Sequence, residues 1–138
     1  MILSDSNVII DARTKASPFH RWAEDVIAEA LSSEGIAINA IVLAELCVGQ
    51  SDPNVIEGEL RTKGVDILDV PAAASPISAR AYSVYLNARV RAGGRHAPRI
   101  PLPDFFIGAH AELMGWSVAT RDTERFRLYF PNVQLIAP

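Results

Sequence analysis

Residues 36–49 read IAINAIVLAELCVG, and this stretch decides the class of fold. Ile36-Ala37-Ile38 is a short apolar run typical of a buried strand, and Asn39 is a residue type that often caps a following helix. The pattern predicts a helix from Ala40 to Val48 that stops near Gly49. A strand that leads directly into a helix is the repeating unit of α/β domains with a parallel sheet.

The same alternation of short apolar runs and helical stretches extends to both ends of the chain. We expect further strands at 1–4, 67–70, 116–120 and 133–136. We expect further helices at 18–33, 53–64, 76–91 and 104–114, of which the first three each start with a capping residue followed by proline. Residues 93–103 hold three prolines and are predicted to form a loop. With no repeat or linker, the sequence predicts a single α/β domain over residues 1–138, with a mostly parallel, roughly five-stranded sheet.

Composition places the chain among globular proteins of reducing compartments. Its length of 138 residues is enough to bury a core, and its single cysteine, Cys47, excludes an internal disulfide. No apolar run approaches the roughly 20 residues that cross a bilayer. The first residues lack a basic stretch followed by an apolar one, so we expect no secretion signal, no membrane attachment and a cytoplasmic location.

The charges of the chain are unevenly distributed. The net charge is −3, yet the segment from Val70 to Pro103 contains no acid and holds five arginines: Arg80, Arg89, Arg91, Arg95 and Arg99. That segment is locally +5, so the remainder is −8 (−3 minus +5). A basic segment in an acidic chain suggests a localised anion-binding face, but charge alone favours a solvated helix face with a loop.

Two aspartates stand where predicted strands end. Asp5 follows the first strand and Asp122 follows the strand at 116–120. Ligands of parallel α/β sheets bind beyond the carboxyl ends of the strands, so both side chains are candidates for a site. Each aspartate by itself is equally consistent with a turn former or a helix cap.

Two further acids lie in apolar surroundings. Glu45 is the single charged residue among eight apolar ones in the helix at 40–48, and a buried carboxylate is costly unless it is paired or bound to a metal. An ion pair with an arginine, or an exposed helix edge, would also explain it. Asp104 precedes Phe105 and Phe106 and opens a helix, where an acid is favoured by the helix dipole alone.

The four acids together predict a metal site. Several carboxylates that converge on one edge of a sheet repel each other and need a counter-charge. Carboxylate oxygens suit Mg²⁺ or Mn²⁺. The single cysteine and the scattered histidines offer no zinc spacing, and His110, on an apolar helix face, is expected to be structural.

Four motifs of the chain resemble those of the PIN-domain family, and their order is preserved along nearly the whole chain. They are Ser4 to Asp11 with its Asp-x-Asn element, Ile41 to Gly49 around Glu45, Pro101 to Ala111 around Asp104, and Thr120-Arg121-Asp122 with the residues that follow. Ser6 stands where the family commonly has threonine. The resemblance implies a PIN-like three-layer α/β/α domain.

The size and ending of the chain resemble VapC-type ribonuclease toxins of type II toxin–antitoxin systems. This resemblance implies a Mg²⁺- or Mn²⁺-dependent endoribonuclease that cleaves RNA phosphodiester bonds with metal-activated water, is inhibited by a small VapB-type antitoxin and forms a homodimer. Its catalytic and metal-binding residues would be Asp5, Glu45, Asp104 and Asp122, with Glu45 either a ligand or the group that orients the water. Asn7 and Thr120 would hold the carboxylates in place, with a turn or cap role as the alternative for Asn7. Arg95 and Arg99 would bind RNA phosphates.

Two alternatives use the same residues differently. A phosphatase with Asp5 as nucleophile would need an acid two residues later and a downstream lysine, but Asn7 occupies the first place and no lysine follows Lys63. A catalytically silent PIN fold that binds RNA or a partner remains the alternative of a different class. All four acids are present, so the sequence favours the enzyme.

Overall fold

The computed structural model describes residues 1–94 and 100–138, and a five-stranded sheet lies at the centre of this part of the chain. The strands are β1 (Ile2–Ser4), β2 (Ile36–Asn39), β3 (Asp66–Leu68), β4 (Ser117–Ala119) and β5 (Leu135–Ile136). Their order is β3-β2-β1-β4-β5, and every pairing between neighbours is parallel. The prediction of an α/β fold with a parallel sheet is confirmed.

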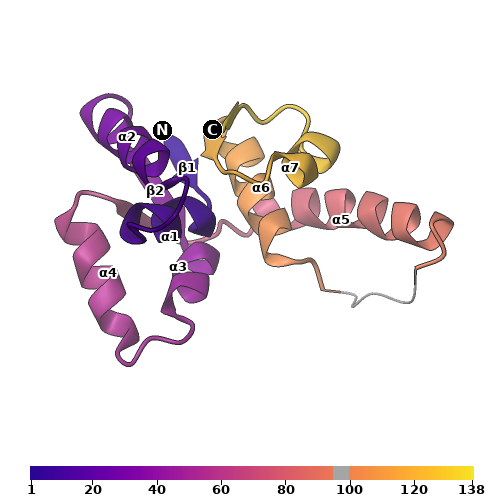
Figure 1. Ribbon diagram of the computed structural model, residues 1–138. Coiled ribbons are helices and arrows are strands. Elements are labelled where there is room, and N and C mark those ends of the chain that lie inside the picture. Colours follow the sequence, from indigo (N-terminus) through magenta and orange to yellow (C-terminus); the bar gives the residue numbers. More distant parts are fainter. Residues whose placement is uncertain (95–99) are drawn as a thin grey trace.

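Seven helices within the described residues enclose this sheet. They are α1 (Ser6–Arg13), α2 (His20–Ser32), α3 (Ala40–Cys47), α4 (Pro53–Thr62), α5 (Ala74–Arg91), α6 (Pro103–Met114) and α7 (Thr123–Tyr129). Figure 1 shows α1 to α4 gathered on one side of the molecule and α5 to α7 on the other. The main contacts between helices follow the same division, although α3 also packs against α6. The result is the three-layer α/β/α arrangement. No helix of this described part is long and apolar enough to span a membrane.

Local signals in the sequence set several helix boundaries. The Asn39 side chain accepts hydrogen bonds from the backbone N–H groups of Ile41 and Val42, both over 3.1 Å, and so caps α3. Asp52 caps α4 in the same way, 3.0 Å from the Asn54 nitrogen. Gly115 follows α6 with a φ of +66°, a left-handed conformation that glycine adopts without a steric penalty.

Two helices were not expected from the sequence. Helix α1 contains three consecutive β-branched residues, Val8, Ile9 and Ile10, whose local preference is for strands. In the fold these residues form a helix instead, which packs Val8 and Ile9 into the core, where they are 0% and 2% exposed. Helix α7 has only seven residues, too few for a clear helical period. Elsewhere the boundaries shift: α5 begins before Pro76, α2 begins after Pro18, and β5 is shorter than expected.

The strand order creates one special position in the sheet. From β1 the chain adds β2 and then β3 on one side, and it returns through α5 and α6 to place β4 on the other side of β1. The carboxyl ends of β1 and β4 are therefore the switch point, where helices diverge to opposite faces. Parallel α/β sheets commonly bind ligands at such a point.

Candidate active site

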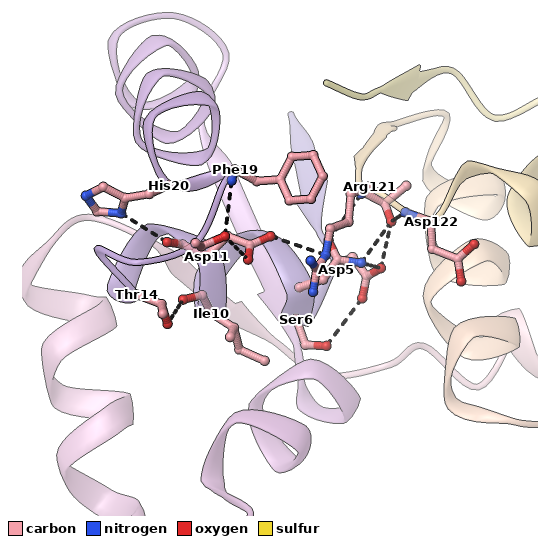
Figure 2. Close-up of polar contacts among 12 residues, drawn as sticks. Asp5, Ser6, Ile10, Asp11, Thr14, Phe19, His20, Arg121 and Asp122 are labelled. Atoms are coloured by element: carbon pink, nitrogen blue, oxygen red, sulfur yellow. Dashed lines mark hydrogen bonds and ion pairs between the residues drawn. The ribbon is translucent and has the colours of Figure 1, made fainter.

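Asp5 follows β1 at this switch point, and its carboxylate is only 5% exposed. Oδ2 accepts hydrogen bonds from Asn7 Nδ2 at 2.6 Å and from Thr120 Oγ1 at 2.8 Å, while Ser6 Oγ lies 3.4 Å from Oδ1 (Figure 2). Burial raises the pKa of Asp5 above its usual range, the hydrogen bonds from Thr120 and Ser6 partly offset this, and the negative charge of Asp122 adds to it.

Asn7 and Thr120 link β1 to β4 across the switch point. Asn7 Nδ2 also donates to Thr120 Oγ1 over 3.2 Å, and Asn7 Oδ1 accepts from the Arg121 backbone N–H at the same distance. Thr120 Oγ1 in turn accepts from the Asp122 backbone N–H over 3.0 Å. Both residues therefore donate directly to the Asp5 carboxylate, and Thr120 also connects it to the backbone of Asp122.

Glu45 lies on α3, close enough to Asp5 for the two negative charges to interact. Among the described residues, its Oε2 atom is buried and has no hydrogen-bond partner. Burial raises the pKa of Glu45, a hydrogen bond from Ser6 lowers it in part, and the charge of Asp5 raises it further. The Ser6 hydroxyl has one proton, so it cannot donate to Asp5 and Glu45 at once. Glu45 has no arginine partner among these residues, and its side chain is only partly exposed.

Asp122 is exposed and stands at the N-cap position of α7, as Asp5 does for α1. Within the described chain, neither side chain makes a capping hydrogen bond to its helix, so capping does not account for either carboxylate. The Asp122 side chain points away from Asp5 in Figure 2. It lines a surface pocket that it shares with Arg125.

Asp104 lies in the first turn of α6, and its carboxylate forms an ion pair with the guanidinium of Arg125 on α7. Arg125, the partner of Asp104, also lines the pocket beside Asp122. The charge of Asp5 interacts with the charges of Glu45 and Asp122, whereas Asp104 is paired with Arg125.

These carboxylates fit a hard divalent cation. Asp5 is buried and Glu45 is half-buried, the charge of Asp5 raises the pKa of Glu45, and one buried oxygen of Glu45 has no partner among the described residues. A bound cation would offset both the repulsion and the unpaired oxygen. Within the part of the chain that the structure describes, no three acid, His or Cys side chains stand together as a ready-made metal site. Asp104 faces Arg125 and Asp122 points outward, so two of the four carboxylates would have to turn to share an ion.

The ion pair between Asp11 and Arg121 was not predicted from the sequence. Asp11 is 3% exposed, Ser17 Oγ donates to its Oδ1 over 2.7 Å, and Arg121 Nε lies 3.2 Å from its Oδ2 (Figure 2). The Arg121 guanidinium also lies over the Phe19 ring, 5.4 Å from its centroid. Arg121 is therefore held away from the Asp5 carboxylate although it directly precedes Asp122. An acid inside the hydrophobic pattern of α1 was the available signal.

Three further residues singled out in the sequence are Arg95, Arg99 and His110. Arg95 and Arg99, expected to bind phosphate, lie outside the described residues. His110 is 2% exposed, its Nδ1 is 3.5 Å from Asn39 Nδ2, and burial lowers its pKa, so it is a neutral core residue at physiological pH. This agrees with the structural role expected for it.

Comparisons with known proteins agree with this fold. The family model described as the PIN domain matches residues 2–130. No match was found among curated proteins. Several solved structures align over almost all of both chains, and three of them illustrate the range. The structure of VapBC2 from Rickettsia felis bound to a promoter DNA fragment is 22% identical with a TM-score of 0.67. The alignment covers 99% of this chain and 98% of that one.

The other two structures are equally complete matches. FitAcB from Neisseria gonorrhoeae is 24% identical with a TM-score of 0.60, and the alignment covers 100% of this chain and 98% of that one. VapC20 from Mycobacterium tuberculosis, described as a sarcin-ricin loop cleaving toxin, is 16% identical with a TM-score of 0.62, covering 97% and 99%. At these identities the likeness concerns the fold.

Proposed function

The chain belongs to the PIN domain family, and on that premise we propose that it is a metal-dependent endoribonuclease, the VapC-type toxin of a toxin–antitoxin pair. One observation carries the proposal: Asp5 interacts with both Glu45 and Asp122 at the switch point of the sheet, and a buried oxygen of Glu45 there lacks a partner among the described residues. An unpaired carboxylate oxygen is costly to bury, whereas a group of carboxylates suits Mg²⁺ or Mn²⁺.

We assign the ion to Asp5, Asp104 and Asp122, with Glu45 as a further ligand or as the group that orients the attacking water. The bound ion would supply a Lewis acid that polarises the scissile phosphate and lowers the pKa of water. Thr120 and Asn7 hold Asp5 Oδ2 in one orientation through the hydrogen bonds at 2.8 and 2.6 Å, so the carboxylate does not have to be ordered during the reaction. Burial raises the pKa of Glu45, which makes its carboxylate a stronger base for a proton from the attacking water.

The partners follow from the same proposal. The structural relatives include complexes named VapBC and a toxin described as cleaving the sarcin-ricin loop. We therefore propose RNA as substrate, a small VapB-type antitoxin as inhibitor, a homodimer as the assembly and the cytoplasm as the location. Arg95 and Arg99 remain proposed contacts for RNA phosphates. A short neighbouring open reading frame whose product co-purifies with this chain would support the antitoxin.

Cleavage of a single-stranded RNA by purified protein, with Mg²⁺ or Mn²⁺ or with excess EDTA, tests the activity. Asp5→Asn should lower the rate by several orders of magnitude, because it removes a ligand charge without removing core volume. Asp69→Asn is the matched control, since Asp69 is an exposed acid that follows β3 at the same edge of the sheet. Full cleavage in EDTA, or by the Asp5→Asn protein, would refute the proposal. Binding without any cleavage would favour a catalytically silent PIN module.

A further inference from the structure

A pocket of about 220 Å³ lies between α5 and α7, beside the candidate active site. Its lining residues are Tyr85, Asp122, Glu124, Arg125, Leu128 and Tyr129. Two of them belong to the site already described, because Asp122 is a candidate metal ligand and Arg125 is paired with Asp104. The pocket is smaller than the 300–1,000 Å³ typical of sites that take up a whole drug-sized ligand, so it suits one ring system of a larger molecule.

Three of the six lining residues give the pocket an aromatic and aliphatic wall that suits the face of a flat ring. The rings of Tyr85 and Tyr129 meet edge to face, with centroids 5.8 Å apart. Leu128 adds an aliphatic wall and is 62% exposed, a high fraction for a leucine. Tyr85 is held from outside by Arg89, whose Nη1 donates to the tyrosine oxygen over 2.9 Å. Nucleobases bind to surfaces of this kind through their ring faces.

The charged residues of the pocket lining would act differently on the base and on the phosphate of a nucleotide. Asp122 and Glu124 disfavour a phosphate inside the pocket but can accept hydrogen bonds from the amino groups of a neutral base. Arg125 is the cation of the lining, and its planar guanidinium suits phosphate. Its present partner, Asp104, is a candidate metal ligand. Binding of a divalent cation by Asp104 would weaken that ion pair and make Arg125 available to RNA.

We propose that this pocket binds one unpaired base of the RNA next to the scissile bond, with Arg125 holding an adjoining phosphate. This inference rests on the proposed function and names the substrate class as RNA with an unstacked nucleotide at the cleavage position. A continuous duplex does not fit, because its bases are stacked and paired and present no free ring face. The pocket is then a specificity site, since its shape and its carboxylate acceptors select the base.

The test uses a short fluorescein-labelled single-stranded RNA and the same RNA with one abasic position, scanned along the strand. Binding is measured by fluorescence anisotropy in the Asp5→Asn background, which prevents cleavage. In the otherwise unchanged protein, one abasic position should weaken binding by roughly five- to 150-fold, the range for one stacked base. In the Tyr85→Leu protein that penalty should largely disappear, because the base contact is already lost.

Three further variants complete the experiment. Leu128→Ala repeats the test without disturbing the aromatic cluster around Tyr85, in case Tyr85→Leu fails to fold. Arg125→Gln should weaken binding of the intact RNA and reduce its salt dependence by about one unit of slope. Val84→Ala, at an exposed apolar neighbour of Tyr85 outside the pocket lining, should change nothing.

Equal abasic penalties in the Leu128→Ala protein and its parent would overturn the subsite. If the wild-type protein nevertheless cleaves RNA, the proposed function stands and only the subsite fails. If the wild-type protein neither cleaves nor binds single-stranded RNA, the proposed function has failed and the subsite falls with it.

Discussion

Thr120 Oγ1 donates a hydrogen bond to Asp5 Oδ2 over 2.8 Å, and this contact joins the carboxyl ends of two neighbouring strands. Thr120 is fully buried, and its hydroxyl also accepts from the Asp122 backbone. One side chain therefore fixes the orientation of Asp5 and the start of the loop that carries Asp122. Such a contact constrains the site without touching substrate.

Thr120→Val should test this positioning role. The substitution keeps the shape of the side chain but removes the hydroxyl, so that Asp5 Oδ2 keeps the hydrogen bond from Asn7 and Oδ1 the one from Ser6. We expect unfolding free energy to fall by about 1–3 kcal/mol, the cost of an unsatisfied buried group. Metal affinity, measured by calorimetry, should fall roughly 10- to 100-fold. Thr120→Ser, which retains the hydroxyl, should restore most of the affinity; equal loss in both variants would indicate a packing role instead.

Glu45→Gln should stabilise the metal-free protein at neutral pH. Burial raises the pKa of Glu45, so the folded state binds its proton more tightly than the unfolded state does. Stability from this group is fully present below the unfolded pKa of about 4.3 and is lost as pH rises through the folded value. The amide carries no such penalty, so the advantage of the variant should shrink as pH falls towards that value.

Urea unfolding of the two proteins at a series of pH values, without divalent ions, measures this difference. Glu29→Gln is the control, because Glu29 is exposed on α2 and should show no pH-dependent gain. Adding Mg²⁺ should stabilise the wild-type protein more than the Glu45→Gln protein, since the ion binds the folded carboxylates. A Glu45→Gln protein that is less stable at neutral pH would show that Glu45 is paired in solution.

Arg125→Gln should raise the affinity for Mn²⁺. The arginine pairs with Asp104, and its charge opposes a cation at the same carboxylate. Both side chains are partly exposed, so the gain should be modest, roughly two- to fivefold. Titration calorimetry without RNA measures it directly. Arg127→Gln, a neighbour on α7 with no ion pair among the described residues, should leave the affinity unchanged. A weaker affinity in Arg125→Gln would mean that the arginine helps to assemble the metal site.

Gly108→Ala should destabilise the fold. A methyl group there would overlap the ring of Phe130, which is 1% exposed and cannot move aside. We expect a loss of about 1–3 kcal/mol or more in unfolding free energy. Gly58→Ala in α4 should have the opposite effect and raise the unfolding free energy by roughly 0.4–1 kcal/mol, because the added Cβ would meet open space on a helix. Equal behaviour of the two variants in thermal unfolding would contradict this packing.

The sequence by itself determined the layers, the parallel sheet and the residues that follow its strands. Asn39 capping α3, Asp52 capping α4 and Gly115 ending α6 are local features, because each depends on backbone groups within a few residues. Side-chain type and spacing suffice for such features. The same local rules did not predict α1, because its three consecutive β-branched residues have no strong local preference for a helix.

Only the tertiary structure decided how the site is assembled. Asp5 and Thr120 are 115 positions apart, and they meet because β1 and β4 are neighbours in the sheet order. The pairing of Asp104 with Arg125 depends in the same way on the packing of α6 against α7, and that of Asp11 with Arg121 on the position of α1 beside the loop that follows β4. Local patterns carry no information on strand order or helix packing, since these follow from the burial of whole elements against one another. The sequence therefore named the acids, and the fold determined which of them interact and which are held by arginines.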